Sequence, residues 1–110
     1  MIVASRSLKL RQAEREADVG VRIFAPRPDQ SHWSCEYEID WPEGVRKGAA
    51  HGHDSVQPLH LALNTVGAEL YTSDYHKTGV LSSNDSWKGY RFPVPKNIRD
   101  LLIGDDAKYL

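Results

Sequence analysis

Residues 52–63 read Gly-His-Asp-Ser-Val-Gln-Pro-Leu-His-Leu-Ala-Leu, and this stretch decides the fold. Asp54 or Ser55 can cap a helix, because a side-chain oxygen at that position accepts hydrogen bonds from the free amides of the first turn. Gln57 lies three residues after Asp54, where a capping box places its second residue. Pro58 is tolerated only within the first turn of a helix, which favours Ser55 as the cap. The stretch therefore predicts the start of the one long helix.

An apolar stripe continues the helix from this start. Its members recur at spacings of three and four residues, the period of one helix face: Val56, Leu59, Leu63, Val66 and Leu70. Ala62 and Gly67 widen the stripe. Because glycine has no side chain, Gly67 would allow this helix to lie close to a sheet.

Alternation of apolar and polar residues before the helix predicts strands. The expected strands cover residues 6–11, 19–25, 33–41 and, more briefly, 45–50. Residues 12–18 are polar and predict a turn or hairpin loop between the first two strands. Pro26 and Pro28 end the second strand, because proline cannot donate to a ladder.

The strand at 33–41 shows the clearest alternation. One face carries Trp33, Cys35, Tyr37, Ile39 and Trp41, and the other carries Ser34, Glu36, Glu38 and Asp40. We expect the helix to cover the aromatic face, so that Cys35 is a core residue and not a nucleophile. We expect the acidic face to meet Arg22 and Arg46 in a solvated layer of cross-strand ion pairs.

The chain after the helix is polar and rich in turn residues. Residues 72–89 predict a long loop, and residues 90–94 alternate briefly before prolines end any pairing. A short helix is expected over 97–102, with Gly104 as its stop.

Together these elements predict one α+β domain over residues 1–110. We expect an antiparallel meander sheet of three to four strands packed on one long helix, with a short C-terminal helix. The end segments 1–5 and 105–110 are expected to lie outside the ordered core.

Length and composition indicate an ordinary globular protein. The 110 residues suffice for one domain and are too few for two, and 40 % hydrophobic with 26 % charged residues excludes a disordered chain. The single cysteine, Cys35, excludes an internal disulfide framework and suits a reducing compartment. Met1–Arg11 is not a signal peptide, and no apolar run approaches the roughly 18 residues of a membrane span. We therefore expect a cytoplasmic protein without a membrane partner.

The charge balance argues against a surface built mainly for nucleic acid. Fourteen basic residues stand against fifteen acidic ones, for a net charge of −1. Phosphate binding needs a basic excess, at least locally. One local candidate is the basic face of the first strand, which comprises Arg6, Lys9 and Arg11 with Arg22.

A cluster of polar residues before the helix suggests the hypothesis of a metal site. His51, His53 and Asp54 are ligands that zinc or another divalent ion accepts, and His60 or His76 could complete the shell. The spacing differs from the His-Glu-x-x-His motif, which places both imidazoles on one helix face. The alternative interpretation is that the histidines line a turn and Asp54 caps the helix.

Aromatic residues in the polar segment after the helix raise the hypothesis of a partner-binding surface. Tyr71, Tyr75, Trp87 and Tyr90 lie in or beside this segment, and tryptophan on a polar loop can anchor a protein partner. The alternative interpretation is that these rings fold back over the sheet.

Three motifs resemble an uncharacterised family of small bacterial proteins. They are Cys35-x-Tyr37-x-Ile39, Gly48-Ala49-Ala50-His51-Gly52, and Asp54-Ser55-x-Gln57-x-Leu59-x-Leu61-Ala62-Leu63. In that family a helix start of the type G-x-D-x-x-Q-x-L-x-L-A-L follows an antiparallel sheet. The resemblance covers residues 6 to 73 and departs from the pattern at His53 and Pro58. It implies a bacterial cytoplasmic protein with the order strand, strand, strand, helix, and it implies no activity and no functional residue.

These observations favour a small non-enzymatic interaction or accessory module. No coherent catalytic set and no cofactor motif is present, and small domains often gain stability by association, so a protein partner or a homodimer is expected. The second hypothesis is a metal-binding protein or hydrolase that uses His51, His53, Asp54 and His60. The third is a weak nucleic-acid binder that uses the basic face of the first strand.

Overall fold

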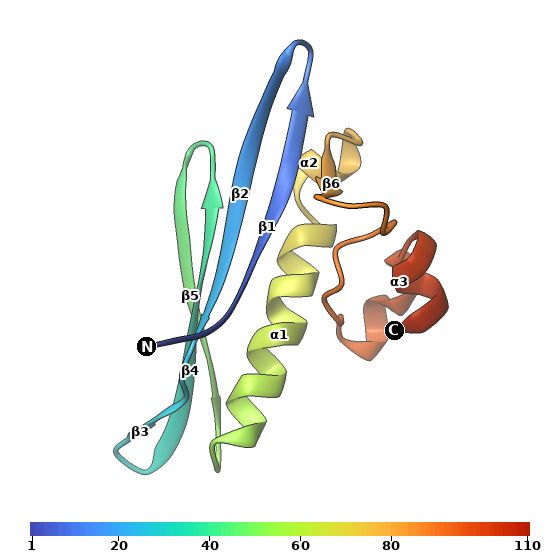
Figure 1. Cartoon of the computed structure of the whole chain (residues 1–110). Helices are drawn as coiled ribbons and strands as arrows, with labels where there is room; N and C mark the ends of the chain where they lie inside the picture. The colour runs from blue at the N-terminus through green and yellow to red at the C-terminus, as the bar shows by residue number, and fades with distance from the viewer.

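In the computed structural model, which describes residues 1–110, six strands form one antiparallel sheet and a long helix packs against one face of it (Figure 1). The strands are β1 (Ile2–Gln12), β2 (Arg15–Phe24), β3 (Arg27–Asp29), β4 (His32–Trp41), β5 (Gly44–Gly52) and β6 (Leu81–Ser83). The helices are α1 (Val56–Tyr71), α2 (Asp74–Lys77), the 3-10 helix η1 (Lys96–Leu101) and α3 (Gly104–Tyr109). The predicted α+β fold is confirmed, with more strands than the three or four expected.

Consecutive hairpins build most of the sheet. The strands lie in the order β6, β1, β2, β4, β5, and β3 pairs with the first residues of β4 beyond the end of β2. The β1–β2 hairpin extends to Gln12 opposite Arg15, so the turn or hairpin loop predicted over 12–18 is confined to residues 13 and 14. Residues 12–18 are exposed on both faces of the projecting hairpin, and for this reason they carry no apolar alternation.

The start of α1 follows the predicted capping pattern. Asp54 Oδ1 accepts hydrogen bonds from the amides of Val56 at 3.1 Å and Gln57 at 2.9 Å. The Gln57 side chain accepts in return from the His53 amide at 2.7 Å. Ser55 occupies the cap position, but its side chain makes no capping bond, so Asp54 supplies the cap that was assigned to Ser55.

The core lies between the inner face of the sheet and α1. Cys35, Tyr37 and Ile39 of β4 are buried there, which confirms that the helix covers the aromatic face of this strand. Trp33 and Trp41, at the two ends of that face, remain partly exposed. The core also includes β1, β2, α1 and the segment before η1: Leu8, Leu10, Val19, Val21, Ile23, Ala62, Val66, Leu70, Tyr90, Phe92 and Val94.

The outer face of the sheet carries paired charges. Arg22 contacts Glu38 at 2.9 Å and Asp40 at 2.6 Å, as expected, and this guanidinium holds the pKa of Asp40 below its usual value. Arg46 was expected in the same layer, but it lies on the inner face and pairs with Glu69 of α1 at 2.8 Å. The reason is the strand register, because Arg46 stands opposite the buried Ile39.

Residues after α1 contain more structure than predicted. The 72–89 segment holds α2 and β6, and the short helix expected at 97–102 is the 3-10 helix η1. Gly104 was expected to stop that helix, but η1 ends at Leu101, and Gly104, with φ of +52°, is the first residue of α3. The end segments expected outside the core contribute to β1 and α3.

No helix combines the length and the apolar character needed to cross a membrane.

At Gly67, α1 and the segment before η1 approach each other closely. A Cβ atom at this position would overlap the backbone carbonyl of Pro93, so the segment before η1 can lie on α1 only because the side chain is absent. The predicted role of Gly67 is confirmed, although the segment that it admits is Pro93 and not a strand.

We therefore expect Gly67→Ala to lower the free energy of unfolding by about 1–3 kcal/mol, the usual cost of overpacking. In an unconstrained helix the same change would be stabilising by about 0.5–1 kcal/mol. Urea denaturation followed by circular dichroism measures the difference. Thr65→Ala, on a partly exposed position of the same helix, is the control and should change stability by less than about 0.5 kcal/mol. A stabilised Gly67→Ala protein would contradict the close approach.

Candidate binding site

A hollow of about 230 Å³ lies between β1 and the segment before η1. Its apolar lining includes Val21, Ile23, Leu63 and Phe92, and its charged lining consists of Arg6 and Arg91. Val21 and Ile23 stand opposite Arg6 and Ala4 in the β1–β2 register, so the side chains of these β1 residues lie on the inner face of the sheet. The hollow therefore joins an apolar surface to two guanidinium groups.

One edge of β1 is free beside this hollow. β6 pairs only with Leu8–Leu10, and β2 occupies the opposite edge of β1. The Asn84 side chain donates to the Ser7 carbonyl at 2.8 Å and so closes the edge at that residue. No strand covers residues 2–6 on this side, and Ile2 and Val3 are each 49 % exposed. An uncovered edge of this kind presents free backbone amides and carbonyls.

Arg6 is the charged group of the hollow that lacks an acidic partner. Its Nη1 donates to the Tyr90 carbonyl at 3.1 Å and the Arg91 carbonyl at 2.8 Å, and its guanidinium lies 4.8 Å from the centre of the Phe92 ring. Partial burial, followed by the charge of Arg91, lowers the pKa of Arg6 from its ordinary value. Arg11, Arg22, Arg27, Arg46 and Arg91 form ion pairs, whereas Arg6 forms none.

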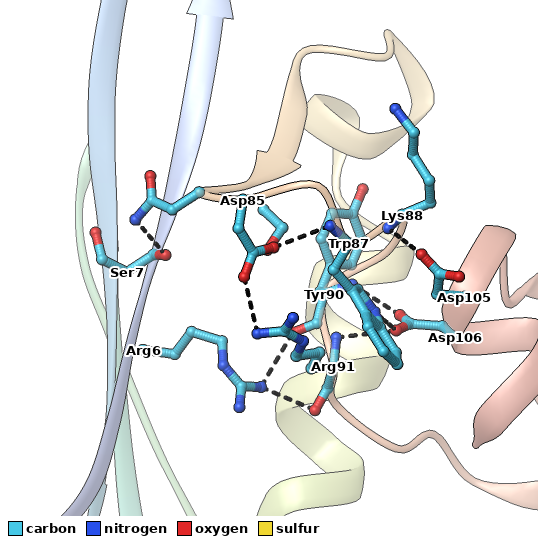
Figure 2. A network of polar contacts seen from close by, with 11 residues as sticks. Arg6, Ser7, Asp85, Trp87, Lys88, Tyr90, Arg91, Asp105 and Asp106 are labelled. Carbon is cyan, nitrogen blue, oxygen red and sulfur yellow. Dashed lines mark hydrogen bonds and ion pairs between the residues drawn. The ribbon is translucent and has the colours of Figure 1, made fainter.

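Arg91 is fixed in an unusual backbone conformation. Its φ of +61° lies in the left-handed region, which residues other than glycine rarely adopt. Asp85 holds its guanidinium at 3.0 Å, and the same group lies 4.7 Å from the centre of the Trp87 ring (Figure 2). Strained residues of this type persist only when their surroundings over-determine them.

Asp106 of α3 provides that constraint. Its carboxylate is fully buried and accepts hydrogen bonds from the amides of Tyr90 at 2.7 Å and Arg91 at 3.0 Å (Figure 2). It also accepts from the Trp87 indole at 2.7 Å and the Tyr71 hydroxyl at 2.5 Å. Burial and this carboxylate raise the pKa of the Tyr71 phenol, which remains a donor. The Asp106 carboxylate therefore holds the backbone that positions Arg91 and the carbonyls bound by Arg6.

Sequence reasoning missed this group because Asp106 lies in the end segment that was expected outside the core. Its donors Tyr71 and Trp87 precede it by 35 and 19 residues, so no local pattern connects them. Only the structure shows that Gly89, with φ of +117°, lies where a side chain would displace the Asp106 carboxylate.

The predicted partner-binding aromatics divide into two groups. Tyr71 and Tyr90 are 3 % and 1 % exposed, so their rings belong to the core and do not form a surface for a partner. Tyr75 and Trp87 are partly exposed, and the Tyr75 ring stacks on Trp41 with 5.1 Å between the ring centres. The correction for Tyr71 and Tyr90 arises because the two rings pack on each other, with 4.9 Å between their centres, and their hydroxyls contact Asp106 and His76 inside the protein.

The residues proposed as metal ligands do not converge. His51 lies on the outer face beside His32, with 5.2 Å between the ring centres, while Asp54 caps α1. His60 contacts Asn64 at 3.1 Å, and His53 shares with Asp54 and His60 only a shallow, open depression. No group of three or more His, Cys, Asp or Glu side chains is placed to hold a metal ion.

The basic face expected on the first strand is divided by the sheet. Arg6 lies on the inner face, and Lys9 and Arg11, at odd positions, lie on the outer face. Lys9 contacts Asp18 at 2.6 Å and Arg11 contacts Glu16 at 3.0 Å, so both charges are neutralised. This separation was predictable from the sequence, because Arg6 lies an even number of residues from Leu8 and Leu10 and therefore shares their face of the strand.

A larger and more open hollow of about 440 Å³ lies between the β4–β5 turn and the end of α1. Two of its three carboxylates already have partners within the protein. Glu43 accepts from the Tyr75 hydroxyl at 2.7 Å, and Glu69 contacts Arg46 and the Tyr37 hydroxyl. The third, Asp74, has no side-chain partner but is exposed to water, whereas the unpaired Arg6 guanidinium is partly buried. An unpaired charge is therefore less costly in this second hollow than at Arg6.

Removing the Asp106 carboxylate should destabilise the protein strongly. We expect Asp106→Ala to lower the free energy of unfolding by at least about 3 kcal/mol, because each buried donor left unpaired costs about 1–3 kcal/mol. Urea denaturation with tryptophan fluorescence measures the loss. The matched control is Asp105→Ala, which removes only the hydrogen bond to the Lys88 amide and should cost about 1 kcal/mol. Equal losses in the two variants would contradict the central position of Asp106.

His76 makes stability depend on pH. Its Nδ1 lies 2.5 Å from the Tyr90 hydroxyl, and burial lowers its pKa in the folded state. As the pH falls below about 6.5, this histidine is protonated more fully in the unfolded chain than in the folded protein. The free energy of unfolding therefore decreases as the pH falls. We expect His76→Asn to flatten this decline between pH 7 and pH 5 in urea midpoints. His60→Asn, at an exposed histidine, should keep the wild-type slope, and matching slopes for all three proteins would refute the assignment.

Comparison with known proteins supports the expected family. Residues 4–94 match the model of the Domain of unknown function (DUF6968), whereas comparison with curated proteins and with solved structures gives no match. The match extends beyond the residues 6 to 73 that carried the resemblance. It includes every residue that lines the hollow at Arg6 and stops before Asp106. Because the model covers most of the chain, the protein belongs to the DUF6968 family.

Proposed function

We propose that the protein is a small non-enzymatic interaction module that binds a partner protein at the hollow between β1 and the segment before η1. The observation that carries the proposal is Arg6, a partly buried guanidinium without an acidic partner, beside a free strand edge. A charge that is partly removed from water and left unpaired is costly, and a ligand carboxylate would offset that cost.

The chemistry of the hollow favours binding over catalysis. Its charged lining consists of two guanidiniums, and it contains no histidine, cysteine or carboxylate that could act as a base. Ser5 stands opposite Arg22 in the β1–β2 register, so its hydroxyl lies on the outer face of the sheet. The one cysteine, Cys35, is buried with its Sγ 3.2 Å from the Phe24 carbonyl oxygen, and burial raises the pKa of its thiol. Neither group has the activation that a nucleophile requires.

A protein partner suits the free edge of β1 better than a small molecule does. Unpaired backbone groups along residues 2–6 can bond to another extended chain, which a compact ligand cannot match over this length. The exposed Ile2 and Val3 lie on the same stretch and would be covered by such a chain. A second copy of the protein could supply this segment, and self-association would then accompany binding.

Filling the hollow should abolish partner binding without unfolding the protein. Ala4 is exposed and lines the hollow, so Ala4→Trp adds bulk there with little cost to the core. Partners captured by the wild-type protein in the source cells are purified and titrated by calorimetry. We expect at least tenfold weaker binding to Ala4→Trp, about 1.4 kcal/mol, and unchanged binding to Val45→Trp on the exposed face of β5.

Sedimentation tests self-association in parallel. A dimer that is lost in Ala4→Trp and kept in Val45→Trp identifies a second copy as the partner and supports the module. Partners that bind both variants equally, together with a monomer at all concentrations, would refute this site as the binding surface.

A further inference from the structure

We propose that the segment bound at this hollow is an extended acidic peptide that adds to the free edge of β1 and places one side-chain carboxylate on Arg6. The inference rests on the proposed function and specifies the chemistry of its partner. In the bound peptide, an apolar residue lies two positions from an aspartate or glutamate, and the protein recognises both side chains.

The free edge of β1 has the properties of a strand acceptor. Residues 2–5 read Ile-Val-Ala-Ser and contain neither lysine nor proline. The one inward charge on this edge is Arg6, which a bound carboxylate would pair, and the one irregularity is a register shift against β2 between Ile2 and Ala4. Residues 2–6 span about 17 Å in an extended chain, enough to pair with a strand of similar length. The opposite edge of the sheet, β5, differs because its inward arginine, Arg46, already pairs with Glu69 and because it also carries Lys47.

Charge selects an acidic segment. Among the donors of the Arg6 guanidinium, Nη1 bonds to the carbonyls of Tyr90 and Arg91, and the other nitrogens have no partner within the protein. A guanidinium with free donors on one side can bind a carboxylate through two parallel hydrogen bonds. Arg91 adds to the positive potential, although Asp85 already pairs with it. Figure 2 shows Arg6 reaching from β1 toward the backbone at Arg91.

Strand geometry sets the spacing of the two recognised side chains. Ala4 and Arg6 are two residues apart and lie on the same face of β1. A strand added beside β1 places its own side chains on that face at every second position. One side chain would then meet Arg6, and its neighbour two positions away would enter the apolar part of the hollow near Ile23 and Leu63. The volume of about 230 Å³ admits one apolar side chain of ordinary size.

Selection from a random peptide library tests the inference without knowledge of the natural partner. Amidated nonapeptides are selected on the wild-type protein, and affinities are measured by fluorescence anisotropy. We expect the selected peptides to share an apolar-x-Asp or apolar-x-Glu pattern, in either direction. Replacing the acidic residue by its amide should weaken binding at least tenfold, and N-methylation should abolish binding at alternate amides only, because strand addition uses every second amide.

Variants of the protein locate the carboxylate. Arg6→Gln should weaken binding at least tenfold, whereas Arg15→Gln, which removes the same charge from the exposed hairpin tip, should leave it unchanged. Arg6→Glu should recover affinity for a peptide whose acidic residue is replaced by lysine, and this rescue requires a folded variant. Two-dimensional NMR should show the shifts confined to residues 2–6 and 91–93 and the side chains that line the hollow.

The outcomes separate this inference from the proposed function. Selected peptides that lack an acidic residue, bind Arg6→Gln normally and fail to bind Ala4→Trp would overturn the acidic specificity and leave the interaction module standing. Failure to select any peptide that distinguishes wild type from Ala4→Trp would overturn strand addition at β1. Failure of the module itself is read from the natural partners and from sedimentation, which do not depend on this library.

Discussion

The buried carboxylate of Asp106 is the interaction on which the C-terminal half of the molecule depends. It gathers the indole of Trp87, the hydroxyl of Tyr71 and the amides of Tyr90 and Arg91 around one charge. A fully buried carboxylate is tolerable only when several donors surround it. The same set of bonds fixes α3 to the segment that covers the core, so a chain end and a loop become parts of one packed layer.

This constraint has a consequence at the surface. The segment between Gly89 and η1 is held against α1 by the contact at Gly67, and against β1 by the hydrogen bonds from Arg6. Where the segment and β1 diverge, the hollow remains. β6 is only three residues long and ends before it reaches the first half of β1. The hollow and the free edge therefore have the same origin, an incomplete cover over the first strand.

The contrast between the two faces of the sheet clarifies why the hollow is a stronger candidate than the charged outer layer. On the outer face, Arg22 and its carboxylates neutralise one another at short distance, so none of these charges lacks a partner. On the inner face, Arg6 faces an apolar lining and main-chain carbonyls. The number of charges on each face is therefore less informative than whether each charge has a partner.

Several features could be predicted because they depend on neighbours along the chain. The cap at Asp54, the stripe on α1 and the alternation in β4 follow from groups within a few residues of one another, so the sequence alone determined the helix, the buried face of β4 and the α+β class. The position of Arg6 on the inner face of β1 could also have been predicted, because it lies two residues from the buried Leu8. The strand residues at the tip of the β1–β2 hairpin were not predicted, because both faces of the hairpin are exposed to water there and the sequence shows no alternation of apolar and polar residues.

Only the tertiary structure decided the site. The partners of Asp106 and the contact between Gly67 and Pro93 are separated by 15 to 35 residues, and no local pattern pairs them. The absence of an acidic partner for Arg6 is likewise a property of the folded chain. The sequence determined which residues form each element, because local hydrogen bonding and periodicity act over short distances. Packing determined which elements meet, because it depends on how their surfaces fit together.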